Sequence, residues 1–417
     1  MGRRREGRQI TRRNALQKLG RASAGVAGLS ILSRSSSAHG AMRVTWKGAA
    51  EGVEVWQLTT ESYSQANIYC EHSYCSADSR WFVYQCKNER GKDGKNPAEY
   101  RAMSFGTWRE RRLDEGVGRT GLAISRDGVF YYLKHVAADD AVYLMRVNLS
   151  KGGPEKLHRL KAPLWSIGTV SPDHRYYACG RMLAGEVEDG RQVFGVCLID
   201  LKTGKERILT RGTDIMNPHP QFAPDGTKLL IQHNRGGKVL PGGKYVNLTG
   251  PQGATLFLLS IADGKRTPLP IGTPHTTPIT GHETWVDATG EILASVGCRD
   301  GYAADRGNLL ALREGAPPRR VARGYAFNHV HASRCGRVFL GDDWKPPYHQ
   351  VIGSIATGKT RVLLDAYDTP RQMPKAAHSH TYLSRDLKWA VFNGDRTGRI
   401  LLYAARVPEG FLTDLLR

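Results

Sequence analysis

The stretch HPQFAPDGTKLLIQH, residues 219–233, contains the pattern on which the fold prediction rests. A short strand-like segment ends at the turn Ala-Pro-Asp-Gly, and a longer segment rich in aliphatic residues follows it. Proline presets the backbone angle that a tight turn needs, and glycine tolerates the left-handed angle at its end. The stretch therefore predicts two antiparallel strands joined by a short turn.

This unit is found seven times along the chain. The six other copies are HSYCSADSRWFVYQC from His72, LAISRDGVFYYL from Leu122, IGTVSPDHRYYACG from Ile167, HETWVDATGEILAS from His282, HVHASRCGRVFLG from His329 and HSHTYLSRDLKWAVFNGD from His378. A further strand and a Thr-Gly or Asp-Gly turn follow each copy, as in VCLIDLKTGKERIL, so each unit is expected to form four strands. Such units, repeated every roughly 45 to 65 residues, are typical of propeller blades.

We therefore predict an all-β fold, a seven-bladed β-propeller with four antiparallel strands per blade. A single four-stranded sheet cannot bury both of its faces, whereas sheets packed around an axis cover one another. A β-sandwich with irregular loops is the other all-β fold considered, but it gives no reason for an in-register repeat. Strand-like segments between Met42 and Leu58 are expected to complete the last blade and close the ring.

The first 40 residues are expected to be a targeting segment rather than part of the fold. The stretch TRRNAL from Thr11 is similar to a twin-arginine export signal, and a weakly apolar run and small residues follow it. A basic amphipathic anchor and a wrongly assigned start are the alternatives. We expect residues 1–40 to be a signal peptide and residues 41–417 to be a single propeller, periplasmic or secreted through twin-arginine export.

The charge of the chain favours an acidic partner. The formal net charge is +21, of which the first 40 residues contribute +8 and the rest +13. A basic surface attracts polyanions, but we find no nucleic-acid motif and no interleaved aromatic and arginine residues that would grip a single strand. We expect an acidic substrate, no nucleic acid, and no stable membrane insertion after signal cleavage, because no later stretch is long and apolar enough to span a bilayer.

The seven cysteines do not have the paired spacing of a metal site. An odd number of cysteines cannot all form disulfides with one another. Cys70 and Cys75 are interpreted either as a disulfide in an oxidising compartment or as buried thiols.

Histidines recur at the start of the first strand in five of the seven copies. Because the first strand of each blade lies innermost, these residues should gather around the mouth of the central channel. One such histidine is more often a structural residue than a ligand, but several at one repeat position favour a metal site, since neutral imidazoles bind Zn, Mn, Fe, Ni and Cu. The residues are His72, His219, His282, His329 with His331, and His378 with His380.

Three segments resemble those of the oligogalacturonate lyases of polysaccharide lyase family 22, and the resemblance covers most of the mature chain. They are GHETWVDATGE from Gly281, HASRCGRVFLGDD from His331, and RQMPKAAHSHTYLSRD from Arg371 with the later FNGDRTG. The family is a seven-bladed propeller that binds a divalent metal through three histidines and a glutamine and cleaves short uronides by β-elimination. The resemblance implies an acidic oligosaccharide substrate and a divalent metal, Mn²⁺ before Ca²⁺, Zn²⁺ or Ni²⁺.

The resemblance also implies roles for individual residues. His282, His378 and His380 match the three metal histidines. Gln372 follows an arginine as the family's glutamine does, but it lies farther from the histidine pair, so the fourth ligand is either Gln372 or water. His233, in IQHNRGG, matches the catalytic histidine, although Asn-Arg-Gly replaces the Glu-Gly-Pro that follows it in the family.

β-Elimination from a 4-linked uronide requires removal of the C5 proton, which becomes more acidic when the neighbouring carboxylate is neutralised. The sequence hypothesis is therefore a metal-dependent lyase in which the metal binds that carboxylate and His233 is the general base. Arg235 and Arg211 are expected to assist through charge-assisted hydrogen bonds. Residues expected to line the substrate site are His331, His219 and His72, and Asp342 and Asp343 are interpreted as turn residues or supports of the site.

A non-catalytic propeller of the TolB type, acting as a periplasmic interaction scaffold, is the alternative function. Such propellers share the Ser-x-Asp-Gly type of turn. They have no reason to gather histidines at the axis, so the presence or absence of bound metal distinguishes the two hypotheses.

Overall fold

The turns of blades one, two, three and seven are each stabilised by a hydrogen bond between their own serine and aspartate. Ser76 Oγ donates to Asp78 Oδ1 over 2.6 Å, and the same contact between Ser171 and Asp173 measures 2.6 Å. The serine oxygen also accepts the backbone N–H of the residue that opens the next strand, as it does from Trp81 over 3.0 Å. These contacts satisfy backbone groups that the reversal would leave unpaired, which explains why serine and aspartate recur.

The fourth residue of every turn has a positive φ. Glycine adopts this left-handed conformation without steric cost, and four of the seven copies use it. The backbone conformation of the turn is therefore the same in all seven copies, even where serine, histidine or leucine replaces glycine. The residues are Ser79 (φ 53°), Gly128 (82°), His174 (57°), Gly226 (73°), Gly290 (66°), Gly336 (69°) and Leu387 (62°).

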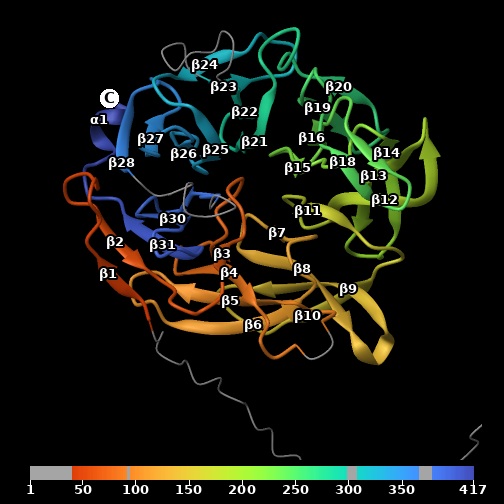
Figure 1. Ribbon diagram of the computed structural model, residues 1–417, viewed down its shortest axis with the longest axis horizontal. Helices are drawn as coiled ribbons and strands as arrows, with labels where there is room; N and C mark the ends of the chain where they lie inside the picture. Colours follow the sequence, from red (N-terminus) through yellow and green to blue (C-terminus); the bar gives the residue numbers. More distant parts are fainter. Residues whose placement is uncertain (1–39, 92–93, 298–307, 366–377) are drawn as a thin grey trace, which may run out of the picture. The chain divides into compact units, whose positions relative to one another are not determined.

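The computed structural model describes residues 40–91, 94–297, 308–365 and 378–417, and it confirms the predicted seven-bladed β-propeller (Figure 1). Blade one contains β3 (Gln65–Asn67), β4 (Trp81–Lys87), β5 (Ala98–Ser104) and β6 (Glu110–Gly116). Blade two contains β7 (Ala123–Ile124), β8 (Val129–Val136), β9 (Ala141–Asn148) and β10 (Glu155–Arg159). Blade three contains β11 (Trp165–Val170), β12 (Tyr176–Glu188), β13 (Arg191–Asp200) and β14 (Glu206–Gly212).

The remaining blades follow the same antiparallel order, with the first strand of each nearest the axis. Blade four contains β15 (Gln221–Phe222), β16 (Lys228–His233), β19 (Thr255–Ser260) and β20 (Arg266–Pro268), and a hairpin of β17 (Lys238–Leu240) and β18 (Lys244–Asn247) is inserted after β16. Blade five contains β21 (Ile279–Val286), β22 (Glu291–Val296), β23 (Leu309–Leu312) and β24 (Arg319–Ala322). Blade six contains β25 (Phe327–Ala332), β26 (Val338–Asp343), β27 (Gln350–Ser354) and β28 (Thr360–Leu364).

Blade seven joins the two ends of the described chain. It contains β29 (Tyr382–Leu383), β30 (Trp389–Gly394), β31 (Leu401–Arg406), and then β2 (Glu54–Gln57) and β1 (Met42–Val44). β2 pairs antiparallel with β31, with Val55 opposite Ala405 (red beside blue in Figure 1). This confirms that the segment between Met42 and Leu58 closes the ring. The predicted signal peptide, by contrast, lies almost entirely outside the described residues.

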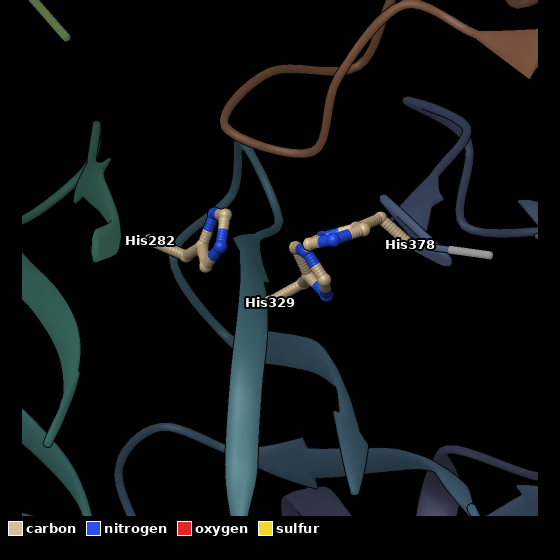
Figure 2. A group of neighbouring side chains, drawn as sticks. All are labelled: His282, His329 and His378. Carbon is tan, nitrogen blue, oxygen red and sulfur yellow. The ribbon is translucent and has the colours of Figure 1, made fainter. Parts of the chain in front are cut away.

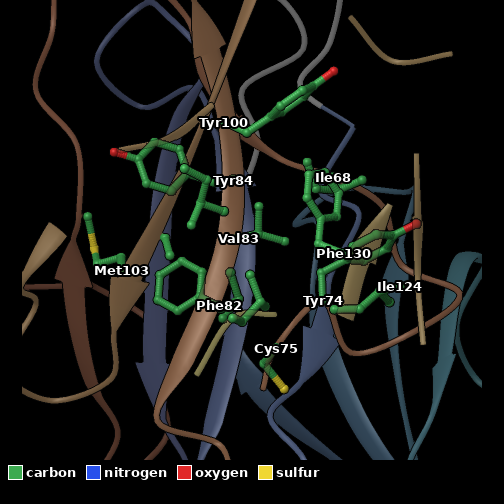
Figure 3. Packing of buried hydrophobic residues seen from close by; sticks show 14 of the residues in the cluster. Ile68, Tyr74, Cys75, Phe82, Val83, Tyr84, Tyr100, Met103, Ile124 and Phe130 are labelled. Carbon is green, nitrogen blue, oxygen red and sulfur yellow. The ribbon is translucent and has the colours of Figure 1, made fainter. Parts of the chain in front are cut away.

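The hydrophobic core lies between neighbouring blades. Phe82 and Tyr84 of β4 and Tyr100 of β5 are fully buried in one cluster with Phe130 of blade two (Figure 3). The ring centroids of Tyr100 and Phe130 are 5.3 Å apart in an edge-to-face contact. Burial of large aromatic side chains between sheets stabilises the ring through the hydrophobic effect and fixes the angle between blades.

The described cysteines are free thiols. Cys70 and Cys75 are both buried and unpaired, so the structure shows the thiol interpretation of this pair rather than the disulfide. Among the described residues, helical structure is limited to the 3-10 turn η1 (Ala137–Asp139) and the short α1 (Thr413–Leu416). Neither has the length or apolar character that a membrane-crossing helix needs.

Val55 provides a test of ring closure because it is 1% exposed and belongs to the core cluster between blades six and seven. We expect Val55→Ala to lower the free energy of unfolding by about 2 kcal/mol, since it leaves a cavity where β2 joins β31. Urea denaturation measures this value. Val246→Ala in β18 is the matched control: Val246 is 49% exposed, and its loss should change stability by no more than about 0.5 kcal/mol. If Val55→Ala lowered the free energy of unfolding no more than Val246→Ala, the packing of β2 would contribute nothing specific to the stability of the ring.

Candidate metal centre and active site

Three histidines from different blades meet at one end of the propeller axis. His282 lies in β21, His329 lies in β25, and His378 lies shortly before β29. One nitrogen from each ring lies within 4.8 Å of the others, and Figure 2 shows the three rings around a common space. The spacing of His329 Nε2 and His378 Nδ1, 3.1 Å, is close to the roughly 3.0–3.5 Å that separates two imidazole ligands of one tetrahedral or octahedral ion.

Asp342 orients the central ring of this group. Its Oδ2 accepts a hydrogen bond from His329 Nδ1 over 2.6 Å and another from Ser379 Oγ over 2.7 Å, and both His329 and Asp342 are fully buried. Burial alone would raise the pKa of Asp342, but the charge and hydrogen bond of His329 outweigh burial and lower it. In the neutral form of His329, Nδ1 donates to the carboxylate and Nε2 presents its lone pair to the common space, as in many metal-binding histidines.

Burial keeps most of these rings neutral. Burial, followed by the charges of the neighbouring histidines, holds the pKa of His282 well below 6.5. Burial and then His329 lower the pKa of His378 to about 4. A neutral imidazole has a free lone pair, so the donor set fits a divalent cation that prefers nitrogen ligands.

His380 and His219 stand beside the three-histidine group in strained backbone conformations. His380 has φ 42° and His219 has φ 41°, and each lies two residues before the first strand of its blade. Residues other than glycine rarely adopt this left-handed backbone region, and such backbone strain concentrates at functional sites. Nδ1 of His380 is buried without a hydrogen-bond partner, and its ring centroid lies 4.9 Å from that of His329. This unsatisfied nitrogen is a further atom that a cation would satisfy.

A segment of blade one, residues 68–73, lies across the axis and contacts the inner strands of four other blades. Tyr69 Oη is 2.9 Å from Nδ1 of His282 and 3.3 Å from Nδ1 of His219. The carbonyl oxygen of Cys70 accepts a hydrogen bond from His331, and Ser73 Oγ donates to the carbonyl oxygen of Leu383. We call residues 68–73 the axial segment; it forms the floor beneath the histidine cluster.

Two carboxyl groups, those of Glu71 and Glu283, lie beneath the cluster. Glu71 Oε1 lies 3.2 Å from His219 Nδ1; burial alone would lower the pKa of His219, but Glu71 outweighs burial and raises it. Burial raises the pKa of Glu283 to about 8, despite the opposing charge of His219. Glu283 is therefore mainly protonated at neutral pH and adds little negative charge below the histidines.

His233, the predicted general base, is paired with a carboxylate. It ends β16, and its Nε2 lies 2.6 Å from Asp214 Oδ2. The preceding residue, Gln232, donates to the carbonyl oxygen of Gly281, next to His282. The end of β16 lies beside the start of β15 in this antiparallel sheet, so His233 is at the same end of the propeller as the histidine cluster. With Nε2 donating to Asp214, Nδ1 carries the lone pair that can accept a proton.

The two arginines expected to assist catalysis are both engaged elsewhere. Arg235 donates to the carbonyl oxygens of Gly253, Thr273 and Gln252, which ties its loop to blade four. Arg211 forms an ion pair with Glu186 and is 64% exposed. The structure therefore places them in structural contacts of blades three and four.

Arg119, in the loop between β6 and β7, is a cation whose charge is felt by the cluster. Its charge contributes, after burial and His329, to the lowered pKa of His380. Burial lowers the pKa of Arg119 itself, opposed by Tyr69 of the axial segment, and no carboxylate of the described residues lies within ion-pair distance of it. Nothing in the sequence pattern distinguished Arg119, because its loop carries no repeat.

The structure divides the predicted site residues into two groups. It brings together His282, His378, His380 and His219, and adds His329, Tyr69, Asp342 and Arg119. His72 and His331 line a separate cavity on the other side of the axial segment. Gln372 lies outside the described residues. His329 was recognisable as a strand-opening histidine, but its partnership with Asp342 depends on the pairing of β25 with β26.

Fold and site together define a seven-bladed β-propeller with a histidine cluster at one end of its axis. No family model matches the sequence, and no curated protein matches it. Among solved structures, an oligogalacturonate lyase in complex with manganese aligns with a TM-score of 0.66 and 18% identity over 89% of this chain and 98% of that one. The oligogalacturonate lyase of Vibrio parahaemolyticus aligns with a TM-score of 0.64 and 14% identity, over the same shares of 89% and 98%. The resemblance to these lyases that the sequence indicated is thus confirmed in the fold.

The lowered pKa of His378 predicts how cation binding depends on pH. Protons compete with a metal for an ordinary histidine below about pH 6.5. Since burial and His329 lower the pKa of His378 to about 4, and that of His282 is lowered well below 6.5, we expect Mn²⁺ affinity to stay nearly constant down to about pH 5.5 and to fall at lower pH. Isothermal titration calorimetry at several pH values measures this dependence.

Two histidine variants control the titration. His282→Ala should abolish measurable Mn²⁺ binding at every pH. His174→Ala should leave it unchanged, because His174, in the turn of blade three, pairs with Asp127 in the turn of blade two. A loss of affinity that begins at about pH 7 in the unmodified protein would contradict the lowered pKa values of His282 and His378.

Proposed function

We propose that the protein is a metal-dependent lyase that cleaves uronic-acid oligosaccharides by β-elimination. The observation that carries the proposal is the convergence, at one end of the axis, of neutral histidines that suit a cation, an arginine with no carboxylate partner among the described residues, and a histidine–aspartate pair. The fold shared with oligogalacturonate lyases supports this choice of chemistry. Oligogalacturonides are therefore the first substrates to test.

The residues proposed to hold the metal are His282, His378, His380 and His329. Their nitrogens fit a cation because the rings are close together and largely neutral and because one of them, His380 Nδ1, is buried without a partner. A divalent ion bound here would act as a Lewis acid that neutralises the substrate carboxylate and makes the C5 proton more acidic. Manganese in the related lyase complex supports Mn²⁺ as the first ion to test.

His233 is proposed to remove the C5 proton. Asp214 holds Nε2, so the proton passes to Nδ1. The C5–H and C4–O bonds break, a C4=C5 double bond forms, and the departing sugar oxygen takes up a proton from water. Asp214 stabilises the imidazolium that results, as a carboxylate does in other histidine–aspartate pairs.

Arg119 is proposed to bind a uronate carboxylate of the substrate and to orient the sugar toward His233. A guanidinium binds a carboxylate through two parallel hydrogen bonds, which fixes orientation as well as position. Arg119 takes the role for which Arg235 and Arg211 were expected, since those two donate to groups of the protein. The net positive charge of the chain assists the approach of an acidic oligosaccharide, and we propose that the chain meets it after export through the twin-arginine route.

His233→Ala should abolish turnover of oligogalacturonides by removing the base. Formation of unsaturated product, followed by ultraviolet absorbance with Mn²⁺ present, measures turnover. We expect at least about a hundredfold loss of kcat, the lower range for a general base, with metal content unchanged. His174→Ala is the matched control, since His174 of blade three also pairs with an aspartate, Asp127 of blade two, over 2.8 Å.

Two results would count against the proposal. One is the absence of unsaturated product from every uronide oligomer tried, with metal bound to the protein. The other is a protein that binds no divalent metal, which would favour the interaction-scaffold hypothesis instead.

Arg119→Gln should raise KM for a uronide substrate about tenfold or more, because a charged hydrogen-bond partner of the carboxylate is lost. Arg119→Lys should recover part of the affinity, and Arg175→Gln, at a guanidinium 62% exposed in blade three, should change nothing. A second measurement does not depend on turnover: loss of the Arg119 charge should raise the pKa of His378 in an NMR titration. Unchanged KM together with an unchanged pKa would exclude Arg119 from the site.

A further inference from the structure

Three arginines occupy the same position in three of the repeated turns. They follow the turn serine in blades two, six and seven, where the copies read Ser125-Arg126, Ser333-Arg334 and Ser384-Arg385. The other four copies have alanine or proline at this position. Because the turns follow the innermost strands, equivalent turn residues approach the axis from several directions.

These arginines lie at the opposite end of the axis from the histidine cluster. On the strand that contains β25, Arg334 follows His329 by five residues, and near β29 Arg385 follows His380 by five. At about 3.3 Å per residue of extended chain, each pair is separated by roughly 16 Å. The axial segment lies between the two ends, so the arginines form a site of their own.

The arginine side chains cross the axis and line a cavity with a volume of about 60 Å³. Arg126 reaches from blade two to Asp287 of blade five over 2.9 Å. Arg385 donates from Nη2 to the carbonyl oxygen of Ser125, and Arg334 donates from Nη1 to the carbonyl oxygen of Arg126. The cavity has room for several water molecules or a small anion.

The guanidinium N–H donors of these three arginines outnumber the hydrogen-bond acceptors around them. Nε and Nη1 of Arg385 are buried and have no oxygen acceptor; the neighbouring sulfur of Cys75 is only a weak one. Of the two carboxylates that line the cavity, Asp287 is paired with Arg126 and Glu71 is hydrogen-bonded to His219. An uncompensated guanidinium in a partly enclosed space is costly unless an anion satisfies it.

We propose that this cavity binds a small oxyanion, such as phosphate, sulfate or a carboxylate, through Arg385, Arg334 and Arg126. Oxyanions match the planar donor fork of arginine, and a single anion accepts hydrogen bonds from several guanidinium groups at once. The anion would link blades two, six and seven at the end of the axis opposite the histidine cluster. The site does not depend on the proposed lyase activity.

Inorganic phosphate is the probe for this site. The full chain, stripped of metal with a chelator, is titrated with phosphate at low ionic strength in a calorimeter. We expect saturable binding to one site, weakened about tenfold or more by Arg385→Gln, which removes a charge-assisted contact. Arg334→Gln, at an exposed side chain that perturbs folding less, should weaken binding in the same direction.

Two further variants separate this site from other effects. Arg406→Gln, at a guanidinium 61% exposed in blade seven, should leave phosphate binding unchanged, and so should His282→Ala in the histidine cluster. Absence of saturable binding in the unmodified protein would overturn the proposal. So would an equal loss in Arg406→Gln, which would indicate attraction to the net charge, or a loss in His282→Ala, which would place the anion at the histidines.

Discussion

The pairing of β2 with β31 is the constraint on which the rest of the structure depends. Residues of blades four to seven meet at the axis only while the seven sheets form a closed ring, and this ladder joins the two ends of the described chain. The interblade cores of aromatic and aliphatic side chains set how each sheet packs on the next. The His282, His329 and His378 rings are brought together by the whole ring, since no two of them share a blade.

The electrostatics of the cluster follow from its enclosure. Rings that come close together cannot all be protonated, and partial or full burial further lowers the pKa of His282, His378 and His380. Asp342 adds one buried negative charge where a cation would be bound, whereas Glu283, with its raised pKa, is mainly neutral. The site therefore has lone pairs and one compensating carboxylate, which is the combination that a divalent ion requires.

The sequence was sufficient to predict the fold, because few architectures other than a propeller repeat one turn chemistry seven times at this interval. It also predicted His282, His378 and His380 as neighbours. His329 was predicted only as one of several strand-opening histidines that favour a metal site, because its particular importance rests on a partner in the next strand. Arg119 was not predicted, because it lies in a loop without a pattern. His72 has the same spacing from its turn as His219 and His380, yet it lies elsewhere. In blade one the first strand ends early, at Asn67, and the axial segment carries His72 past the cluster.

The axial segment also governs how molecules reach the histidines. Ile68, Tyr69, Cys70 and Glu71 are each at most 6% exposed, and their contacts extend to blades four, five and six. The axial segment thus lies across the channel of the propeller beneath the histidines. A ligand of the histidines would have to enter and leave from the same end of the axis, so a long polymer could not be threaded through the ring, whereas a short chain or a chain end could reach the histidines.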